Sequence, residues 1–335
     1  MTKRVTLQDV AKAAGVSITT VSRVINSGPH VRPDVQERVQ HAVETLGYQP
    51  NAVARSLRSG RDTTIGVVVD SLADIFFATF ADAIEEVAAQ RGLAVTIASS
   101  GRQQDRERGL VERFLQRQVA GLILVPVAPS PRFLPSLRRS TPVVFADRLV
   151  DMPDVDAVVG DDYPDALAAT RHLLAHGHNR IAYLGDAEVI HTSAARLAGY
   201  RAALAEATVP ELAPLIITGC SEPEQAEKAT RELLGQRDGP TAIFSSNLRC
   251  TIGAVTVLHA EKRTDVAVVG FGDFPLAGAL QPAVTVVDQD PGRMGKLCAQ
   301  RLLDRIDGST AEPSVTVVSG QLITRGSGEI SCAPS

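Results

Sequence analysis

The 335-residue sequence lacks the features that mark secreted, membrane-bound and disulfide-stabilised proteins. No apolar run is long enough to span a bilayer, and the N-terminus has no apolar signal-peptide core. The four cysteines are scattered, with no CxxC or other metal-ligand spacing, so nothing indicates a disulfide. We therefore expect a cytoplasmic protein without a membrane partner.

Sequence motifs of common catalytic and cofactor sites are also missing. No HExxH, P-loop or GxSxG motif occurs, and the segment GFGDFP (270–275) has a proline where a dinucleotide fingerprint needs its third glycine. His172, His176 and His178 are close in sequence, but no nearby cysteine or carboxylate completes a metal site. We interpret them as basic residues at a helix C-terminus closed by Gly177. The sequence predicts no enzyme, metal or cofactor.

The first thirty residues contain two short amphipathic segments around a tight turn. In VTLQDVAKAAGVSITTVSRVIN (5–26), apolar residues recur at helical spacing before and after Gly15. Ala11 and Gly15 are small where two helices must approach, Gly15 tolerates a positive φ, and Ser17 suits the N-cap of the second helix. This pattern predicts a helix-turn-helix whose second helix enters the DNA major groove; an ordinary helical hairpin is the alternative.

The second helix of this motif carries the side chains suited to reading bases. Arg23 can bind a guanine edge through two hydrogen bonds, and a threonine methyl or Ile18 can contact a thymine methyl. Hydroxyl and amide groups suit phosphate oxygens, which set the register without reading sequence. The predicted DNA-contacting residues of the motif are Thr6, Ser17, Ile18, Thr19, Thr20, Ser22, Arg23 and Asn26. For each of them a solvated helix surface is the alternative.

Residues 5–60 resemble the headpiece of the lac/purine-repressor family of bacterial transcription factors. The match runs through TLQDVAKAAGVS, TTVSRVIN, a third helix over about 33–46, and GYQPNAVARSLRSG (47–60). In that family the last segment is a hinge helix that folds on operator DNA, where two hinges meet in the minor groove and insert leucines. The resemblance therefore implies a homodimer or tetramer on a palindromic operator, with hinge contacts from Asn51, Val53, Ala54, Leu57 and Arg58.

The chemistry of the hinge segment agrees with this implied role. Pro50 and Asn51 suit a helix start, but about nine residues are too few for a helix that is stable alone in water. An exposed Leu57 beside two arginines suits a wedge that unstacks bases. A frayed interdomain linker is the alternative.

Charge is divided unevenly along the chain. Residues 1–60 hold eight lysines and arginines against four acidic residues, a balance of +4, whereas the whole chain carries −4, which leaves −8 for residues 61–335. A basic N-terminal segment on an acidic remainder fits DNA contact confined to that segment. Its modest charge implies weak binding by one copy, so a dimer is expected.

Residues 61–335 alternate short apolar runs with helical stretches. Runs typical of buried parallel strands stand at 64–70, 93–99, 121–126, 142–147, 155–161, 180–186, 215–219, 241–246, 266–271 and 284–289. The alternation predicts two-lobed α/β architecture with doubly wound parallel sheets. In such sheets ligands bind at the carboxyl ends of the strands.

The order of these runs resembles the effector domain of the same family, a two-lobed fold shared with periplasmic sugar-binding proteins. The resemblance implies an all-α helix-turn-helix headpiece at 1–49, a hinge helix at 50–60, and an effector-binding and dimerisation domain at 61–335. The first lobe would hold about 61–160 and 292–320, and the second lobe about 161–291 and 321–335.

The resemblance also implies an effector site between the lobes. The residues expected in it are Phe76, Phe77, Asp147, Arg148, Thr192, Arg196, Asn247, Asp273 and Gln289. Asp147, Arg196 and Asn247 suit a hydroxyl-rich solute, with strand-end caps and surface ion pairs as alternative roles. The chain departs from the family pattern at Leu248 and Gly272, where acidic residues are usual, and it has no tryptophan to stack on a sugar ring.

The predicted function is a sequence-specific DNA-binding regulator, a repressor controlled by a small metabolite, with a sugar or sugar derivative favoured. A smaller, phosphorylated, acidic or nucleoside-like effector stays open, as does a corepressor design of the kind that controls nucleoside or purine metabolism. Two other classes are weighed against it. One is a solute-binding receptor, which residues 61–335 alone would fit, and the other is an α/β enzyme, for which no nucleophile–base pair is visible.

Overall fold

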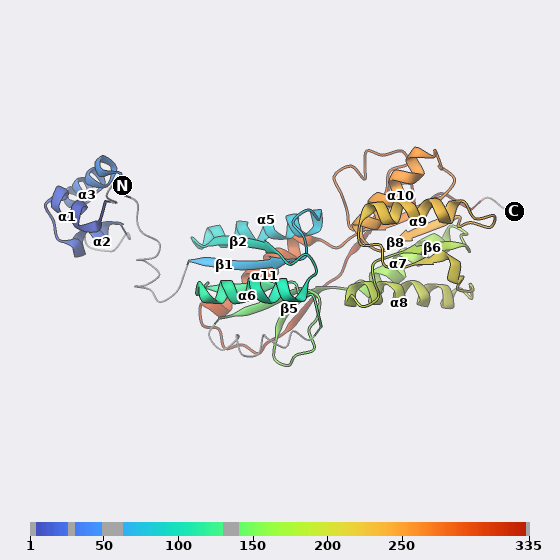
Figure 1. Cartoon of the computed structure of the whole chain (residues 1–335), viewed down its shortest axis with the longest axis horizontal. Coiled ribbons are helices and arrows are strands. Elements are labelled where there is room, and N and C mark those ends of the chain that lie inside the picture. The colour runs from blue at the N-terminus through green and yellow to red at the C-terminus, as the bar shows by residue number, and fades with distance from the viewer. Residues whose placement is uncertain (1–4, 26–30, 49–62, 130–140, 333–335) are drawn as a thin grey trace. The chain divides into compact units, whose positions relative to one another are not determined.

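The chain forms two compact units, Met1–Asp62 and Thr63–Ser335, in a computed structural model (Figure 1). The structure describes residues 5–25, 31–48, 63–129 and 141–332. No helix among these residues is both long and apolar enough to cross a bilayer. The four cysteines are free thiols. The predicted hinge helix at 50–60 falls outside the described residues and stays a prediction.

The described part of the N-terminal unit consists of helices joined by tight turns. The first helix begins where Thr6 and Asp9 cap each other's backbone, and it ends at Gly15, whose φ of +65° suits glycine. The Ser17 hydroxyl accepts the Thr20 N–H at 3.1 Å and starts the next helix. The helices are α1 (Leu7–Ala14), α2 (Ile18–Ile25) and α3 (Pro33–Leu46). The predicted helix-turn-helix is confirmed.

A small apolar core holds these helices together. α1 contributes Val10, Ala11 and Ala14, which lie at the helical spacing read from the sequence. Val21 of α2 packs against them, and α3 closes the core through Val39 and Ala42. The apolar side chains point inward on all three helices, which leaves the opposite face of α2 exposed to solvent.

The first lobe of the C-terminal unit is a parallel sheet with helices on both faces. Across the described sheet the strands are β11 (Val315–Val318), β5 (Asp156–Gly160), β4 (Val143–Asp147), β3 (Gly121–Leu124), β1 (Thr64–Val69) and β2 (Ala94–Ser99). The helices are α5 (Ile75–Gln90), α6 (Gln104–Gln116) and α11 (Pro291–Ile306). α5 and α11 pack on one face through Phe80, Ile84 and Met294, and α6 packs on the other through Val111 and Phe114.

The second lobe repeats this layered architecture. Its strands, in order across the sheet, are β12 (Gln321–Ile323), β10 (Thr285–Asp288), β9 (Ala267–Phe271), β8 (Ala242–Ser245), β6 (Ile181–Leu184) and β7 (Ile216–Ile217). Its helices are α7 (Asp162–Ala175), α8 (His191–Glu206), α9 (Pro223–Leu234) and α10 (Leu248–Ala260), and the short 3₁₀ helix η1 (Ala213–Leu215) precedes β7. α7 and α8 cover one face and α9 and α10 the other. The predicted pair of doubly wound α/β lobes is confirmed.

One edge of the second sheet differs from the sequence prediction. β12 pairs with β10 in the antiparallel direction, whereas the sequence predicts parallel sheets. β11 and β12 are short and partly exposed edge strands that were not predicted, although VTVV (315–318) has the same sequence as the start of the run predicted at 284–289. The chain passes between the sheets after β5, after β10 and after β11, so the lobes share these crossings.

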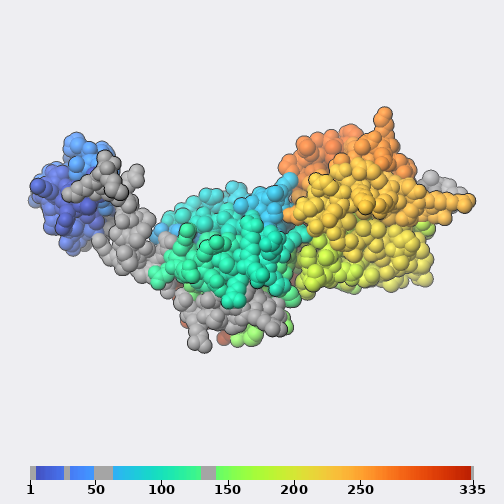
Figure 2. Space-filling view, in the orientation of Figure 1, coloured from blue at the N-terminus to red at the C-terminus, as the bar shows by residue number. Residues whose placement is uncertain are grey.

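The two lobes of the C-terminal unit meet along one seam. Figure 2 shows cyan and blue residues of the first lobe against orange and yellow residues of the second. Because parallel strands end at the same edge of a sheet, the carboxyl ends of strands in both lobes are the places where a ligand is expected to bind.

Candidate functional site

Hydroxyl groups predicted to contact DNA take part in helix caps of the N-terminal unit. The Thr6 hydroxyl donates to Asp9 Oδ2 at 2.6 Å. The Ser17 and Thr20 hydroxyls lie 2.8 Å apart, at the start of α2. These bonds fix the first turns of α1 and α2, so the three side chains have a structural role whether or not they also reach a phosphate.

The exposed face of α2 offers a different set of groups. Ile18 is 43% exposed, an unusual position for a large apolar side chain on so short a helix, and Thr19 and Arg23 are exposed beside it. A branched apolar group, a hydroxyl and a guanidinium match the methyl and acceptor groups that base edges present in the major groove. Ser22 is half-buried. The remaining predicted contacts, Asn26, Asn51, Val53, Ala54, Leu57 and Arg58, lie outside the described residues.

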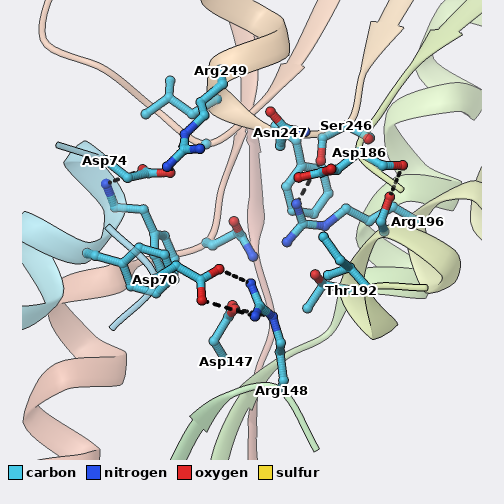
Figure 3. Close-up of a pocket in the computed structure, with 18 of the residues that line it drawn as sticks. Asp70, Asp74, Asp147, Arg148, Asp186, Thr192, Arg196, Ser246, Asn247 and Arg249 are labelled. Atoms are coloured by element: carbon cyan, nitrogen blue, oxygen red, sulfur yellow. Dashed lines mark hydrogen bonds and ion pairs between the residues drawn. The ribbon is translucent and has the colours of Figure 1, made fainter. Parts of the chain in front are cut away.

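A cavity in the C-terminal unit opens where strands of both sheets end (Figure 3). Its volume is about 640 Å³, counted out to its open mouth. The strand order reverses between β1 and β3 in the first sheet and between β6 and β8 in the second. Asp70, Asp186 and Ser246 follow β1, β6 and β8 and line the cavity. The cavity therefore lies at both reversal points, where open α/β sheets bind ligands.

Asp70 and Arg148 form a buried ion pair on the first-lobe side of this cavity. Arg148 Nη1 donates to Asp70 Oδ1 at 3.2 Å and to the Pro126 carbonyl at 3.1 Å, while Nη2 donates to Asp70 Oδ2 (Figure 3). Asp70 is only 1% exposed. Arg102 Nε also lies 3.6 Å from Asp70 Oδ2. Because Asp70 is almost fully buried, its charge depends on these two arginines for its stability.

Two further arginines connect the lobes across the cavity. Arg102, which follows β2, donates through Nη1 to Asp186 Oδ2 in the second lobe. Arg249, in the first turn of α10, lies with its Nε 3.4 Å from Asp74 Oδ2 in the first lobe (Figure 3). Burial raises the pKa of Asp74, and the nearby Arg249 cation opposes that rise.

Arg196 enters the cavity from α8 and is held from three sides. Its Nε donates to Asp162 Oδ1 at 2.7 Å and its Nη1 donates to the Ser246 carbonyl at 2.7 Å. Its guanidinium carbon lies 4.1 Å from the centre of the Phe271 ring. The Arg196 cation is therefore neutralised by Asp162 and stacked on an aromatic face within the protein itself.

Asp147 ends β4 at the cavity in a strained backbone conformation. Its φ of +65° lies in the left-handed region, which is uncommon for any residue other than glycine. Burial raises the pKa of Asp147 to about 6, although the Arg148 cation opposes this rise. Arg148 Nε lies 3.4 Å away, but the same guanidinium already binds Asp70. A strained and weakly compensated buried carboxylate is a typical feature of a functional site.

Two amide side chains complete the polar lining. Asn247 caps α10 by accepting the Cys250 N–H through Oδ1 at 2.9 Å, and its amide nitrogen has no partner among the described residues. Gln289 is 6% exposed and follows β10, where the chain crosses between lobes. Both amides can donate and accept hydrogen bonds, as a hydroxyl-bearing ligand requires.

Two family profiles match the chain over most of its length. One, described as bacterial regulatory proteins of the lacI family, matches residues 6–51, and the other, described as periplasmic binding proteins and sugar binding domain of the LacI family, matches residues 62–325. The chain belongs to the LacI family. It is therefore a transcriptional regulator with a DNA-binding N-terminal domain, as the sequence predicts, and not an enzyme.

Individual relatives of this LacI-family regulator span nearly the whole chain. Catabolite control protein A of Priestia megaterium is 32% identical over 319 residues, covering 93% of this chain and 95% of that protein. The HTH-type transcriptional regulator GalS of Salmonella typhimurium is 35% identical over 309 residues, covering 91% of each. The crystal structure of the lac repressor dimer bound to operator and the anti-inducer ONPF matches with a TM-score of 0.86 at 27% identity, covering 97% of this chain and 99% of that one.

The structure brings most of the predicted effector residues of this LacI-family chain into the one cavity. They are Phe76, Phe77, Asp147, Arg148, Thr192, Arg196, Asn247 and Gln289. Asp273 is the exception. Its carboxylate binds Arg325 Nη1 at 2.7 Å and Nη2 at 2.6 Å, a contact that lowers the pKa of Asp273, and it does not line the cavity.

Five charged residues of the cavity were missed by the sequence reading: Asp70, Asp74, Arg102, Asp186 and Arg249. Asp70 and Asp186 carry a usable signal, since each stands at the end of an apolar run predicted as a strand. Arg102 and Arg249 carry none, because the carboxylates that define their role belong to the opposite lobe.

The histidines near the end of α7 anchor the C-terminal segment of the chain. His172 Nε2 lies 2.6 Å from Glu329 Oε1, and His178 Nε2 lies 2.6 Å from the Ile330 carbonyl oxygen. A carboxylate distant in sequence thus lies beside His172, which the sequence reading did not anticipate. Among the described residues, no group of three histidines, cysteines or carboxylates is arranged to hold a metal ion.

Glu107, a buried residue of α6, makes the stability of the protein depend on pH. It is 1% exposed, and its Oε2 accepts the Val127 N–H at 2.5 Å, next to the Pro126 carbonyl that binds Arg148. Burial raises the pKa of Glu107 from 4.5 to about 7. The folded protein therefore binds this proton more tightly than the unfolded chain, so stability falls as the pH rises from about 4.5 to 7.

We expect Glu107→Gln to remove this part of the pH dependence and to raise the free energy of unfolding above pH 7 by about 1–3 kcal/mol. Thermal denaturation of the parent and the variant between pH 5 and 8 measures the effect. Glu112→Gln is the matched control, because Glu112 lies on the same helix, has a side chain that is 43% exposed, and pairs with Arg108. Identical slopes in the parent and the Glu107 variant would show that Glu107 does not titrate in this range.

Proposed function

We propose that this chain acts in the cytoplasm as a homodimeric repressor whose operator affinity is set by a small molecule bound in the cavity between the lobes. One observation carries the proposal: the cavity is lined by side chains of both lobes, so any molecule in it contacts both at once. Such a molecule can shift the lobes between two arrangements only by binding one of them more tightly. If the two arrangements of the lobes also differ in operator affinity, this preference of the ligand for one arrangement changes how tightly the protein binds DNA.

The DNA side of the proposal rests on α2 and the predicted hinge. Two copies of α2 in successive major grooves would read a palindromic operator through Ile18, Thr19 and Arg23. The lac repressor dimer bound to operator, which this chain resembles along its length, supports a dimer as the DNA-binding form. The hinge helix at 50–60 would then lie in the minor groove, with Leu57 as the wedge.

We further propose a neutral, hydroxyl-rich effector of sugar size. Each arginine that lines the cavity already binds a carboxylate: Asp186, Asp70, Asp162 and Asp74 pair with Arg102, Arg148, Arg196 and Arg249. An anionic ligand would also face the carboxylate of Asp147, whose nearest arginine, Arg148, already binds Asp70. To gain an arginine, an anion would have to break an ion pair and leave a buried carboxylate unpaired. A polyol instead finds acceptors on Asp147 and donors on the amide side chains.

The effector proposal is tested by thermal denaturation of the full chain with matched pairs of compounds, neutral sugars and nucleosides against their phosphate esters. A ligand present at 100 times its dissociation constant stabilises by about 2.7 kcal/mol, which gives a clear rise in Tm. We expect stabilisation by a neutral compound and none by its phosphate ester. Stabilisation by the phosphate ester alone would overturn the neutral class. A titration with operator present then shows whether the compound acts as inducer or corepressor.

The DNA proposal predicts a sequence-specific loss on removing Arg23. Arg23→Ala should cost about 1–3 kcal/mol on an operator selected from random DNA by the parent protein, and it should relax the preference at one base pair in each half-site. Fluorescence anisotropy at fixed salt, on the selected operator and on single-base variants, measures both effects. Lys12→Ala removes the same charge from α1 and should weaken binding to all sequences alike. Uniform weakening by Arg23→Ala would assign Arg23 to phosphate instead.

A further inference from the structure

Two ion pairs cross the cavity between the lobes, and their polarities are opposite. Arg102 of the first lobe donates to Asp186 of the second, and Arg249 of the second lobe lies 3.4 Å from Asp74 of the first. Both pairs are largely shielded from solvent: the exposed side-chain fractions are 28% and 10% in the first pair and 14% for both partners in the second. Figure 3 shows Arg249 directed toward Asp74 across the cavity.

The Arg249–Asp74 pair is tied to a helix at both ends. Asp74 is the N-cap of α5 and accepts the Phe76 N–H at 3.1 Å, while Arg249 lies in the first turn of α10 and donates to the Ser221 carbonyl at 2.9 Å. In the Arg102–Asp186 pair, Asp186 accepts the Ala187 N–H at 2.8 Å in the loop that follows β6, and Arg102 Nε lies 3.6 Å from Asp70 in its own lobe. Movement of one lobe against the other therefore stretches the Arg249–Asp74 pair, because neither side chain is free to rotate with the movement.

We propose that Arg102–Asp186 and Arg249–Asp74 are the positioning pairs that hold the lobes in the arrangement the effector prefers. This inference rests on the proposed function, since it assigns the cavity an effector. A ligand that contacts both lobes adds attraction between them, in the same sense as the two pairs. Weakening a pair lowers the population of this arrangement, so the variant binds effector less tightly. By linkage its operator affinity moves in the direction opposite to the effector's own influence.

Arg249 offers an internal control for this idea. The same guanidinium contacts two carboxylates: Asp74 in the opposite lobe, and Glu222 Oε1 at 3.1 Å in its own lobe. Asp74→Asn removes the charge that crosses the cavity while keeping a side chain able to cap α5. Glu222→Gln removes a charge from the same arginine without touching the contact between lobes. The two variants differ in which lobe holds the lost carboxylate; Glu222 is also the more exposed of the two, at 61% against 14%.

The experiment measures the operator affinity of the full chain, without effector, for the parent, Asp74→Asn, Arg249→Gln, the double variant and Glu222→Gln. We expect Asp74→Asn, Arg249→Gln and the double variant to shift the affinity by the same factor, about fivefold or more. The effects of the two single substitutions should not add in the double variant, because all three proteins lack the same ion pair between Asp74 and Arg249. Glu222→Gln should match the parent. If a neutral compound stabilises the parent, the affinity of that compound for Asp74→Asn, Arg249→Gln and the double variant should be lower than for the parent. The factor should equal the change in operator affinity.

Each outcome decides the inference. Additive effects of Asp74→Asn and Arg249→Gln, an equal shift in Glu222→Gln, or unchanged operator affinity in all variants would overturn it. A loss of effector affinity with unchanged operator affinity would make the two residues ligand contacts and nothing more. If no compound stabilises the parent, the effector proposal fails separately, while the operator affinities still decide the role of the pair. Should Arg249→Gln lower the Tm sharply, Asp74→Asn and Glu222→Gln alone suffice for the comparison.

Discussion

Replacing Arg148 by leucine is expected to lower the free energy of unfolding by about 3–5 kcal/mol. The reason is the fate of Asp70. Its carboxylate is 1% exposed and accepts hydrogen bonds from both Nη atoms of Arg148, so the substitution leaves a buried charge with only the longer contact to Arg102 Nε, at 3.6 Å. The Pro126 carbonyl loses a donor at the same time. Chemical denaturation followed by circular dichroism measures the loss.

Two controls separate this cost from the general effect of deleting an arginine. Arg171→Leu breaks an exposed pair with Glu206, whose side chains are 55% and 49% exposed, and should cost no more than about 1 kcal/mol. Adding Asp70→Asn to Arg148→Leu should recover much of the loss, because the uncompensated charge is then gone. A loss in Arg148→Leu as small as that in Arg171→Leu would mean that solvent reaches Asp70 once the arginine is removed.

The sequence predicted those parts of the fold that depend on local patterns. Two apolar runs, each followed by an acidic residue, predicted strands at TIGVVVD and PVVFAD. The structure has β1 and β4 there, with Asp70 and Asp147 at their ends. The turn at Gly15 was readable because small residues, a cap and apolar spacing stand within a few positions of one another. Strand-end position, a local property, was therefore enough to place several cavity residues.

What the sequence did not predict depends on contacts between distant residues. Asp273 stands beside the cavity residue Gly272, yet Arg325, which is 52 positions later, draws its carboxylate away. Arg102 meets Asp186 at a separation of 84 residues. β12 is a strand because β10 offers it a free edge, and its own three residues carry no periodic signal. No local pattern encodes these partners, so only the folded arrangement identifies them.

The second large effect is expected at Asp147. Asp147→Asn should weaken effector binding by about tenfold to a hundredfold, because a buried carboxylate that accepts ligand hydroxyls contributes about 1.5–3 kcal/mol through charged hydrogen bonds. Asparagine has the same shape and tolerates the left-handed backbone at this position, where φ is +65°. The loss therefore reports the charge of residue 147 and not its conformation. Calorimetric titration with the neutral compound that stabilises the parent measures it.

Asp147→Asn should increase the stability of the folded protein although it weakens effector binding. Since burial raises the pKa of Asp147 to about 6, the folded protein binds this proton more tightly than the unfolded chain, and at pH 7 the charged form is a cost to folding. Asp147→Asn removes that cost, so the free energy of unfolding at pH 7 should rise by up to about 3 kcal/mol. A residue whose replacement stabilises the fold while weakening the ligand is retained for binding.

The pH dependence of effector binding gives an independent check on Asp147. In the parent protein, affinity should fall as the pH drops below about 6, where the carboxylate becomes protonated, whereas the Asp147→Asn variant should show a flat profile. Asp273→Asn is the matched control, because Asp273 binds Arg325 outside the cavity and its loss should leave effector affinity and its pH profile unchanged. An Asp147→Asn protein that keeps the parent's affinity would show that the carboxylate does not contact the effector. The amides of Asn247 and Gln289 would then have to supply the polar contacts on their own.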